Sequence, residues 1–418
     1  MKKLLSFLAI VSVFTICKAN GSINSNNKSN NNSGIRAGSD ADSSSAQIPV
    51  VAVLAIPENL TNVGRYRELR ASGITESYYS FPNANAVQAA LDVAQKTGIK
   101  VFVACPELKQ DPEGTVRRFM NHPALAGYFL QDEPSSTAFS TLGNLVKKIR
   151  SIDDKHVCYI NLLPIYSVEK SMGVRSYQEY LDRFISEVPA QLLSFDNYPI
   201  YGSTMQSIHK EWYQNLEMIA EAGKKAHIPF WGFALSVAQV PYPVPSIGAL
   251  RLQVYSNLAY GAQGIEYFTY WTPSGGKFHT AAIGTDGRQT EVYRSLQTLN
   301  KEIKDLSGVF LGAEMVSVYH TGNRTVGTKA MSNLPKPITI LKTGGMGAVV
   351  STLKNNGKTY LVIVNHDFTT DMALTIKCLP GVNRINKDGS SVAQNQATDI
   401  YKIEPGDVAI FSWPDSMN

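Results

Sequence analysis

Short apolar runs alternate with longer amphipathic stretches over most of the chain, beginning near residue 48. The short runs are rich in β-branched and aromatic residues, and glycines or prolines punctuate most junctions, which predicts strands. The expected strands are Val50–Ile56, Ile74–Ser80, Val101–Cys105, Leu125–Gln131, His156–Leu163, Leu192–Tyr198, Pro229–Leu235 and Gly264–Trp271. Between them, apolar positions at helical spacing predict helices that include Ala86–Thr97, Thr137–Ile149, Tyr177–Val188, Ser207–Ala226 and Gly248–Ala259.

Eight strands that alternate with helices predict a (β/α)8 barrel, which we place over residues 48–313, with a last helix at Gln289–Leu306. A doubly wound open sheet would instead need a glycine-rich turn after its first strand. The corresponding turn reads Pro57-Glu58-Asn59-Leu60, so the open sheet is set aside.

The pattern changes from Glu314 onwards, where β-type runs follow one another without long helical stretches. Turn signals such as Asn355-Asn356-Gly357 and Asp388-Gly389 separate these runs. The pattern predicts a small antiparallel β-sandwich over residues 314–418. Its expected strands include Ile338–Lys342, Ala348–Leu353, Thr359–Asn365, Met372–Cys378 and Asp407–Trp413.

Residues 1–19 have the pattern of a bacterial export signal, since Met1-Lys2-Lys3 is charged and an apolar run up to Ile16 follows. Cys17 ends this run, and a Ser/Asn-rich segment continues to residue 47, as expected for a lipidated cysteine on a flexible tether. Ile16 stands where a lipoprotein signal has a small residue, so cleavage after Ala19 is the alternative. Both interpretations predict export, to the periplasm or as a lipoprotein at the cell surface, and membrane contact only through Cys17.

Composition narrows the class of partner. The formal net charge is only +5 over 418 residues and no Lys/Arg block stands out, so a nucleic-acid partner is not expected. The other cysteines, Cys105, Cys158 and Cys378, have spacings that fit neither a disulfide framework nor a zinc site, and no cofactor or metal is implied. The 20 Tyr and 4 Trp residues suit a sugar ligand, because sugar rings stack their C–H faces on aromatic rings.

Polar and aromatic side chains gather where the expected strands end, and the active sites of such barrels lie at those ends. The fourth strand ends in Gln131-Asp132-Glu133-Pro134, and two adjacent carboxylates after an apolar run are costly unless chemistry uses them. Carboxylates, amides and aromatic rings that converge on one mouth predict a carbohydrate site. The residues expected to bind the sugar are Gln131, Asp196, Asn197, Tyr198, Tyr270, Trp271 and His279.

The Asp132–Glu133 pair predicts glycoside hydrolysis, which needs a carboxylic acid that protonates the leaving oxygen. We assign Glu133 as this general acid, because a neighbouring carboxylate in a partly apolar site raises the pKa, and Asp132 as its partner. Successive strand residues face opposite sides, so both reach the mouth only if the strand ends between them, which Pro134 favours. Glu266, early in the eighth strand, is interpreted as a buried structural carboxylate, and Asn161 lies on the fifth strand.

Three segments of the predicted barrel resemble known glycoside hydrolases. His122–Pro134 resembles the fourth-strand segment of clan-A-like glycoside hydrolase barrels. Ser194–Pro199 resembles the sixth-strand motif of glycoside hydrolase family 42, the β-galactosidases, and Gly261–Trp271 with the following Gly275–His279 resembles that family's eighth strand and loop. The resemblance implies that Glu133 is the acid/base.

This chain departs from the family 42 pattern at two positions. Asp132 stands where the family has Asn, and the family's nucleophilic Glu, at the end of the seventh strand, falls at about Ala234. No carboxylate lies near Ala234 on that strand, so the retaining mechanism of the family is not open to this chain.

Three interpretations remain. The first is substrate assistance, which the resemblance to hexosaminidases with adjacent Asp-Glu pairs implies: the 2-acetamido oxygen of the sugar attacks, Asp132 accepts the acetamido N–H, and Glu133 is the acid. The second is inversion, with Asp196 or Glu58 as the base that activates water. The third is that catalysis is lost and the chain is a non-catalytic glycan-binding surface lipoprotein.

Overall fold

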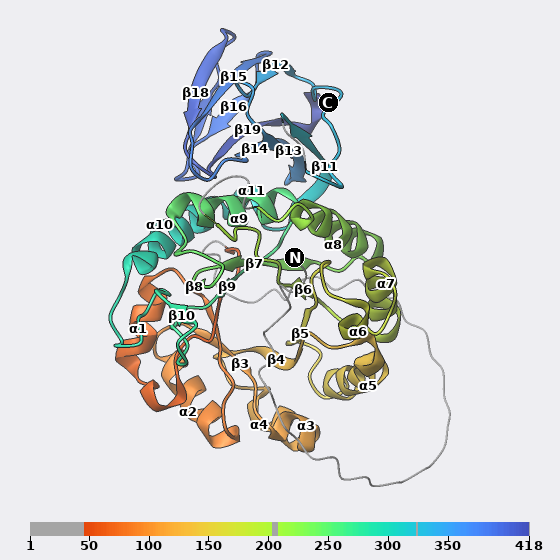
Figure 1. The fold of residues 1–418 in the computed structure, drawn as a ribbon, viewed down its shortest axis with the longest axis vertical. Helices are drawn as coiled ribbons and strands as arrows, with labels where there is room; N and C mark the ends of the chain where they lie inside the picture. Colours follow the sequence, from red (N-terminus) through yellow and green to blue (C-terminus); the bar gives the residue numbers. More distant parts are fainter. Residues whose placement is uncertain (1–45, 203–207, 323–324, 418) are drawn as a thin grey trace. The chain divides into compact units, whose positions relative to one another are not determined.

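The eight strands predicted in the first part of the chain close into a parallel barrel (Figure 1). This computed structural model describes residues 46–202, 208–322 and 325–417. Each strand pairs with the next one along the barrel, and β9 closes it by pairing with β1. The strands are β1 Val50–Val53, β2 Glu76–Tyr78, β3 Lys100–Val103, β4 Leu125–Asp132, β5 Val157–Leu162, β6 Leu193–Phe195, β7 Phe230–Leu235 and β9 Ile265–Phe268.

Helices follow the strands and cover the outside of the barrel (Figure 1). The predicted helices are confirmed within a few residues as α2 Ala84–Gln95, α5 Phe139–Arg150, α7 Tyr177–Glu187, α8 Trp212–Ala226, α9 Ile247–Ala259 and α10 Glu291–Asp305. The apolar pattern did not predict α1 (Val63–Ala71), because only Tyr66 and Leu69 of its nine residues are buried. Further short helices, likewise not predicted, are α3 Glu107–Gln110, α4 Pro112–Phe119, α6 Glu169–Met172 and α11 Ser307–Phe310.

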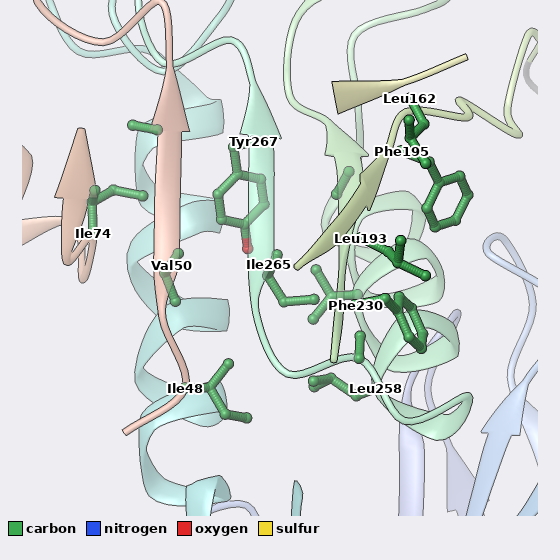
Figure 2. Close-up of a cluster of buried hydrophobic side chains, with 14 of the residues drawn as sticks. Ile48, Val50, Ile74, Leu162, Leu193, Phe195, Phe230, Leu258, Ile265 and Tyr267 are labelled. Atoms are coloured by element: carbon green, nitrogen blue, oxygen red, sulfur yellow. The ribbon is translucent and has the colours of Figure 1, made fainter. Parts of the chain in front are cut away.

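The barrel strands bury side chains on both faces, as parallel strands covered by helices do. Figure 2 shows part of the layer between strands and helices, with Leu193, Phe230 and Ile265 near Leu258 of α9, and Val50 farther along the same cluster. The residues next to these along the strands point the other way and fill the barrel interior. That interior cluster includes Val51, Tyr78, Phe102, Tyr159, Tyr198, Phe233, Leu235 and Phe268.

Antiparallel sheets follow the barrel, which confirms the predicted β-sandwich. One sheet is formed by β11 Glu314–Thr321, β13 Ala348–Asn355, β14 Lys358–Asn365, β19 Val408–Pro414, β16 Asn383–Ile385 and β17 Ser391–Ala393. The other is formed by β12 Ile338–Lys342, β15 Met372–Cys378 and β18 Asp399–Ile403. Leu361 and Phe411 of the first sheet pack with Leu374 and Ile376 of the second in one buried cluster. The proposed boundary between residues 313 and 314 stays a prediction.

Helix α9 connects the barrel to the larger sheet. Eleven of its thirteen residues are buried, as in a helix that is covered all round. It lies against β7 on the barrel side and against β13 and β14 on the other, where Ser351 Oγ donates to the Ala259 carbonyl at 2.6 Å. Arg251 of α9 pairs with Glu302 of α10 at 2.6 Å and with Glu404 at 2.6 Å. Polar contacts therefore supplement apolar packing at this junction.

The predicted export signal with Cys17, and the predicted tether up to residue 45, lie outside the described residues and stay predictions. Within the described ranges, no helix combines the length and the apolar character needed to cross a membrane.

Candidate active site

The end of β4 places both members of the Asp132–Glu133 pair at the barrel mouth. Strand β4 ends at Asp132, one residue before Glu133, as the position of Pro134 predicted. Glu133 has φ +41°, in the left-handed region that non-glycine residues rarely adopt. Its amide N–H donates to the Asn161 carbonyl at 2.9 Å, which holds this turn against β5. Such strain at a non-glycine residue is typical of functional sites.

The Asn161 amide holds two carboxyl groups together at this mouth. Its Nδ2 donates to Asp132 Oδ1 at 3.0 Å and to Asp196 Oδ1 at 3.1 Å. Asn161 lies on β5, between β4 and β6 in the barrel, and Asp196 directly follows β6. The strand order thus brings together groups that lie 64 positions apart in the sequence, from Asp132 to Asp196.

Glu133 and Asp196 form a hydrogen-bonded carboxyl pair. Desolvation, the charges of Asp196 and Asp132, and this hydrogen bond raise the pKa of Glu133 to about 9. Desolvation and the Asp132 charge raise the pKa of Asp196 to about 7, although hydrogen bonds from Asn161 and Glu133 oppose that rise. Because like charges in contact disfavour double ionisation, one proton stays on the pair near neutral pH, and Glu133 holds it.

Asp132 keeps contact with solvent, yet burial among the groups of the mouth raises its pKa, and the hydrogen bond from Asn161 opposes this rise. Three carboxyl groups therefore share one small region, in which Asp132 is exposed and Glu133 and Asp196 are half-buried. The predicted pair of carboxyl groups is in fact a triad with Asp196.

Aromatic side chains form one wall of the mouth. The Tyr198 ring stacks on Phe268 at 5.7 Å and meets the Tyr242 ring edge-on at 6.2 Å. Burial and the nearby Asp196 charge raise the pKa values of Tyr198, Tyr242 and Tyr166. Tyr166, in the loop after β5, is 41% exposed, and its ring stacks on His209 at 5.4 Å. Tyr198 and Phe268 are buried, so the rings of this wall that keep exposed surface beside the carboxyl triad are Tyr166 and the half-buried Tyr242.

Two predicted sugar contacts lie elsewhere. Tyr270 and Trp271 are buried in the layer outside the strands rather than in the barrel interior. The Tyr270 ring lies 6.5 Å from the Tyr293 ring of α10, and the Arg65 guanidinium of α1 lies over Trp271 at 5.1 Å. The two assignments stay predictions that this packing does not support, because the rings are buried under the helices that cover this side of the barrel.

The remaining predicted contacts are spread around the mouth. Gln131 accepts a hydrogen bond from Lys109 at 2.7 Å. Asn197 is buried and donates to Asn215 of α8 at 2.8 Å. His279 is exposed on the short strand β10 (Phe278–His279), which pairs with β8 (Ala238–Gln239). In the part of the chain that the structure describes, no hydrogen bond joins Gln131, Asn197 or His279 to the carboxyl triad.

The seventh strand presents no carboxylate to the mouth. Ala234 belongs to the layer between strands and helices, and the neighbouring Leu235 belongs to the barrel interior. The inward position on β7 is therefore Leu235 rather than Ala234, and it is also apolar. Glu58, the other candidate base, is exposed in the turn after β1.

A polar network lies beneath the triad, inside the barrel. Ser194 Oγ lies 3.1 Å from Asn161 Oδ1, 2.8 Å from Glu266 Oε2 and 3.3 Å from the Tyr159 hydroxyl. Glu266 is fully buried, as predicted, and desolvation raises its pKa to about 8, although its polar contacts with Tyr159 and Ser194 oppose this rise. Within the described part of the chain, no group of His, Cys, Asp and Glu side chains could hold a metal ion.

The sequence patterns did not identify Tyr166 or Tyr242 as part of the mouth, and they placed Phe278 there without assigning it to sugar binding. Phe278 contacts Phe268 at 6.2 Å, so it, rather than the neighbouring His279, joins the aromatic cluster. The available signal was an aromatic residue a few positions after the end of β5 or β7.

Comparisons with known proteins agree with a glycosidase-like barrel. Residues 144–306 match the sequence model of glycoside hydrolase family 42, described as beta-galactosidase. The matched region runs from within α5 to the end of α10 and stops before the β-sandwich. It excludes Asp132 and Glu133. No curated protein sequence matches this chain.

Solved structures similar to this chain include two β-galactosidases and a xylanase. The β-galactosidase of the psychrophilic Marinomonas ef1 is 13% identical, with a TM-score of 0.46, over 62% of this chain and 60% of that one. The corresponding values for the β-galactosidase of Halorubrum lacusprofundi are 14%, 0.45, 63% and 59%. For the GH30 endoxylanase of Clostridium papyrosolvens C71 they are 11%, 0.46, 88% and 96%.

The chain thus spans about 60% of the length of the β-galactosidases to which it is similar. The family resemblance predicted from the motifs at Ser194–Pro199 and Gly261–Trp271 is confirmed, since both lie in the matched region. This chain carries a glycosidase-like (β/α)8 barrel, whose residues 144–306 are similar to glycoside hydrolase family 42.

Proposed function

We propose that this protein is a glycoside hydrolase that cleaves O-glycosidic bonds, with Glu133 as its general acid. The observation that carries the proposal is the contact of the Glu133 carboxyl group with Asp196, beside Asp132, at the mouth of a glycosidase-like barrel. A carboxyl group with a pKa of about 9 keeps its proton at neutral pH and is ready to donate it.

The protonation state of Glu133 suits the first step of glycoside cleavage. As the bond between the anomeric carbon and the leaving oxygen breaks, Glu133 gives its proton to that oxygen. The carboxylate that results lies next to Asp132 and Asp196, so it regains a proton readily from water at the end of the cycle. The exposed ring of Tyr166 and the half-buried ring of Tyr242 support binding of the sugar beside these groups.

We further propose that the substrate's own 2-acetamido group replaces the missing protein nucleophile. Retaining glycosidases place their two carboxyl groups about 5–5.5 Å apart, and inverting ones about 6.5–9.5 Å apart. The hydrogen bond that raises the pKa of Glu133 instead brings Asp196 closer to it than either arrangement does, which favours a nucleophile from the substrate. The inward residue of β7, Leu235, offers no nucleophile.

In this mechanism the acetamido oxygen forms the new bond to the anomeric carbon while the glycosidic C–O bond breaks. Asp132, which faces open water, accepts the acetamido N–H and stabilises the positive charge that develops on this group. Water then attacks the anomeric carbon and reopens the ring intermediate, with Glu133 as the base. The product keeps the anomeric configuration of the substrate.

A non-catalytic glycan-binding function is the second candidate, because the inward position of β7 carries no carboxylate. Both functions use the aromatic wall. They differ in turnover, which only the first predicts.

The experiment is a panel of aryl glycosides that includes N-acetylhexosaminides and the matching unacetylated sugars. We expect turnover of an N-acetylhexosaminide, with the product anomer retained when its formation is followed by NMR. An inverted product would assign the base to Asp196 instead. Glycan binding in the absence of turnover on every member of the panel would establish the binding protein.

A further inference from the structure

The hydrogen-bond network beneath the carboxyl triad has only one consistent direction. Asn161 uses both hydrogens of its amide nitrogen on Asp132 and Asp196. The reverse orientation would place the amide oxygen against two carboxyl groups, at least one of which is ionised near neutral pH. Asn161 Oδ1 therefore points inward, to Ser194 Oγ at 3.1 Å, and needs a donor there.

Ser194 has a single hydroxyl hydrogen, and Asn161 Oδ1 takes it. The contact of 2.8 Å between Ser194 Oγ and Glu266 Oε2 must then be donated from the Glu266 side, which requires a protonated carboxyl group. If Glu266 were ionised, it would take the Ser194 hydrogen, and Asn161 Oδ1 would lose its donor. The proton on Glu266 thus determines which partner donates in each hydrogen bond from Glu266 through Ser194 to Asn161.

The surroundings of Glu266 keep that proton in place. Its side chain is fully buried in the barrel interior, and its register partners are Val51 of β1 and Phe233 of β7. Desolvation is the largest influence on its pKa, and the charges of Asp196 and Glu76 raise this pKa further. The polar and titratable groups that act on Glu266 are Tyr159, Ser194, Asp196 and Glu76.

We propose that Glu266 is a positioning residue for the active site: as a neutral acid it donates to Ser194, and so holds the Asn161 amide in the orientation that binds Asp132 and Asp196. This proposal deepens the proposed function and rests on it for its kinetic part. It assigns a role to a buried carboxyl group that contacts neither the Asp132–Glu133 pair nor open solvent.

The proton on Glu266 can be tested without any assay of activity. An infrared difference spectrum at pH 6, wild type minus Glu266→Gln, should show one positive carbonyl band of a buried, protonated carboxylic acid. Loss of carboxylate bands alone would overturn the proposal. Glu133 is protonated in both proteins, so its band cancels. The infrared measurement needs no substrate, so it gives a result even if no glycoside is turned over. Failure of the Glu266 proposal is therefore distinguishable from failure of the proposed function.

The kinetic arm compares Glu266→Gln with Glu266→Leu on the best substrate of the panel. The Gln side chain has an N–H donor for Ser194, whereas Leu has none, so Gln should restore most of an about ten- to hundredfold loss of kcat in the Leu variant. In wild type, activity should begin to fall above about pH 8 as Glu266 ionises, and in Glu266→Gln this fall should move to higher pH. Equal activities of the two variants, with an alkaline limit in Glu266→Gln unchanged from that of wild type, would reduce Glu266 to a structural residue. Ser194→Ala removes the hydroxyl group that links Glu266 to Asn161, so it should lose activity like the Leu variant. It replaces Glu266→Leu in the comparison if that variant does not fold.

Discussion

Replacing Glu133 by Gln should lower kcat/KM on a glycoside with a poor leaving group by about two to four orders of magnitude, the usual contribution of a general acid. Gln is nearly isosteric and can still donate an N–H to Asp196, but it cannot give a proton to the leaving oxygen. Steady-state kinetics at neutral pH measures the effect. The matched control is Glu113→Gln on α4, where an exposed carboxylate pairs only with Arg117 at 3.2 Å; its kinetics should equal those of wild type.

The stability of Glu133→Gln checks that the loss is chemical rather than structural. The pKa of Glu133 is raised in the folded protein, from 4.5 to about 9, so the proton is held more tightly in the folded state. The contribution of Glu133 to stability is therefore fully present below pH 4.5 and is lost as the pH rises towards 9. Gln does not titrate, so the Tm of the variant relative to wild type should rise between pH 5 and pH 9. A variant that melts lower at every pH would attribute the lost activity to damage of the fold.

Replacing Asp132 by Ala should lower kcat on an N-acetylhexosaminide by about a hundredfold or more, comparable to the loss of one preorganised group that stabilises transition-state charge. Asp132 is assigned to the acetamido N–H, so its removal leaves the attacking group misoriented. The loss should appear in kcat rather than in KM, because the charge develops only in the transition state. Kinetics on the acetylated substrate at neutral pH measures it.

The matched comparison for Asp132→Ala is Asp196→Asn. Substrate assistance predicts a smaller kinetic loss for Asp196→Asn, accompanied by a lower pKa of Glu133, since the charge and the hydrogen bond that raise this pKa are weakened. The alkaline limit of activity should move down accordingly. Inversion predicts the opposite order of losses, with Asp196→Asn the more damaging. Activity restricted to unacetylated galactosides would contradict substrate assistance.

The barrel could be predicted because its strands are buried on both faces and therefore read as continuous apolar runs. Val50–Val53 is buried at every position, and helix signals follow most of the runs of this kind. The opposite case is β17, whose residues Ser391–Ala393 are all exposed, so its sequence carries no apolar pattern. Helix α1 was missed for a similar reason, since it packs through only Tyr66 and Leu69.

The site could be predicted only as far as strand ends determine it. Asp132 and Glu133 follow from the end of β4, but their contact with Asp196 depends on the left-handed backbone of Glu133 and on the Asn161 amide. Neither is visible in a sequence pattern. Tyr166 and Tyr242 lie in loops, whose positions depend on tertiary packing rather than on periodicity.

The eighth barrel strand, β9, also shows that side-chain positions beyond a strand end cannot be predicted from the sequence. Its regular alternation ends at Phe268, so the side chains of Tyr270 and Trp271 cannot be placed by counting along the strand. The absence of a nucleophile on β7 was easier to infer. Ala234 and Leu235 are both apolar, so no carboxylate faces the mouth whichever of the two points inward.

The leaving-group dependence of Glu133→Gln tests the central claim most directly. A general acid matters most when the leaving group is basic, so kcat/KM should be measured on aryl glycosides whose phenols span a wide range of pKa, for wild type and variant side by side. If Glu133 is the acid, the variant should approach wild type on the most acidic phenols and fall progressively behind as the phenol becomes more basic. An equal loss across the whole series would contradict the assignment of Glu133 as the proton donor.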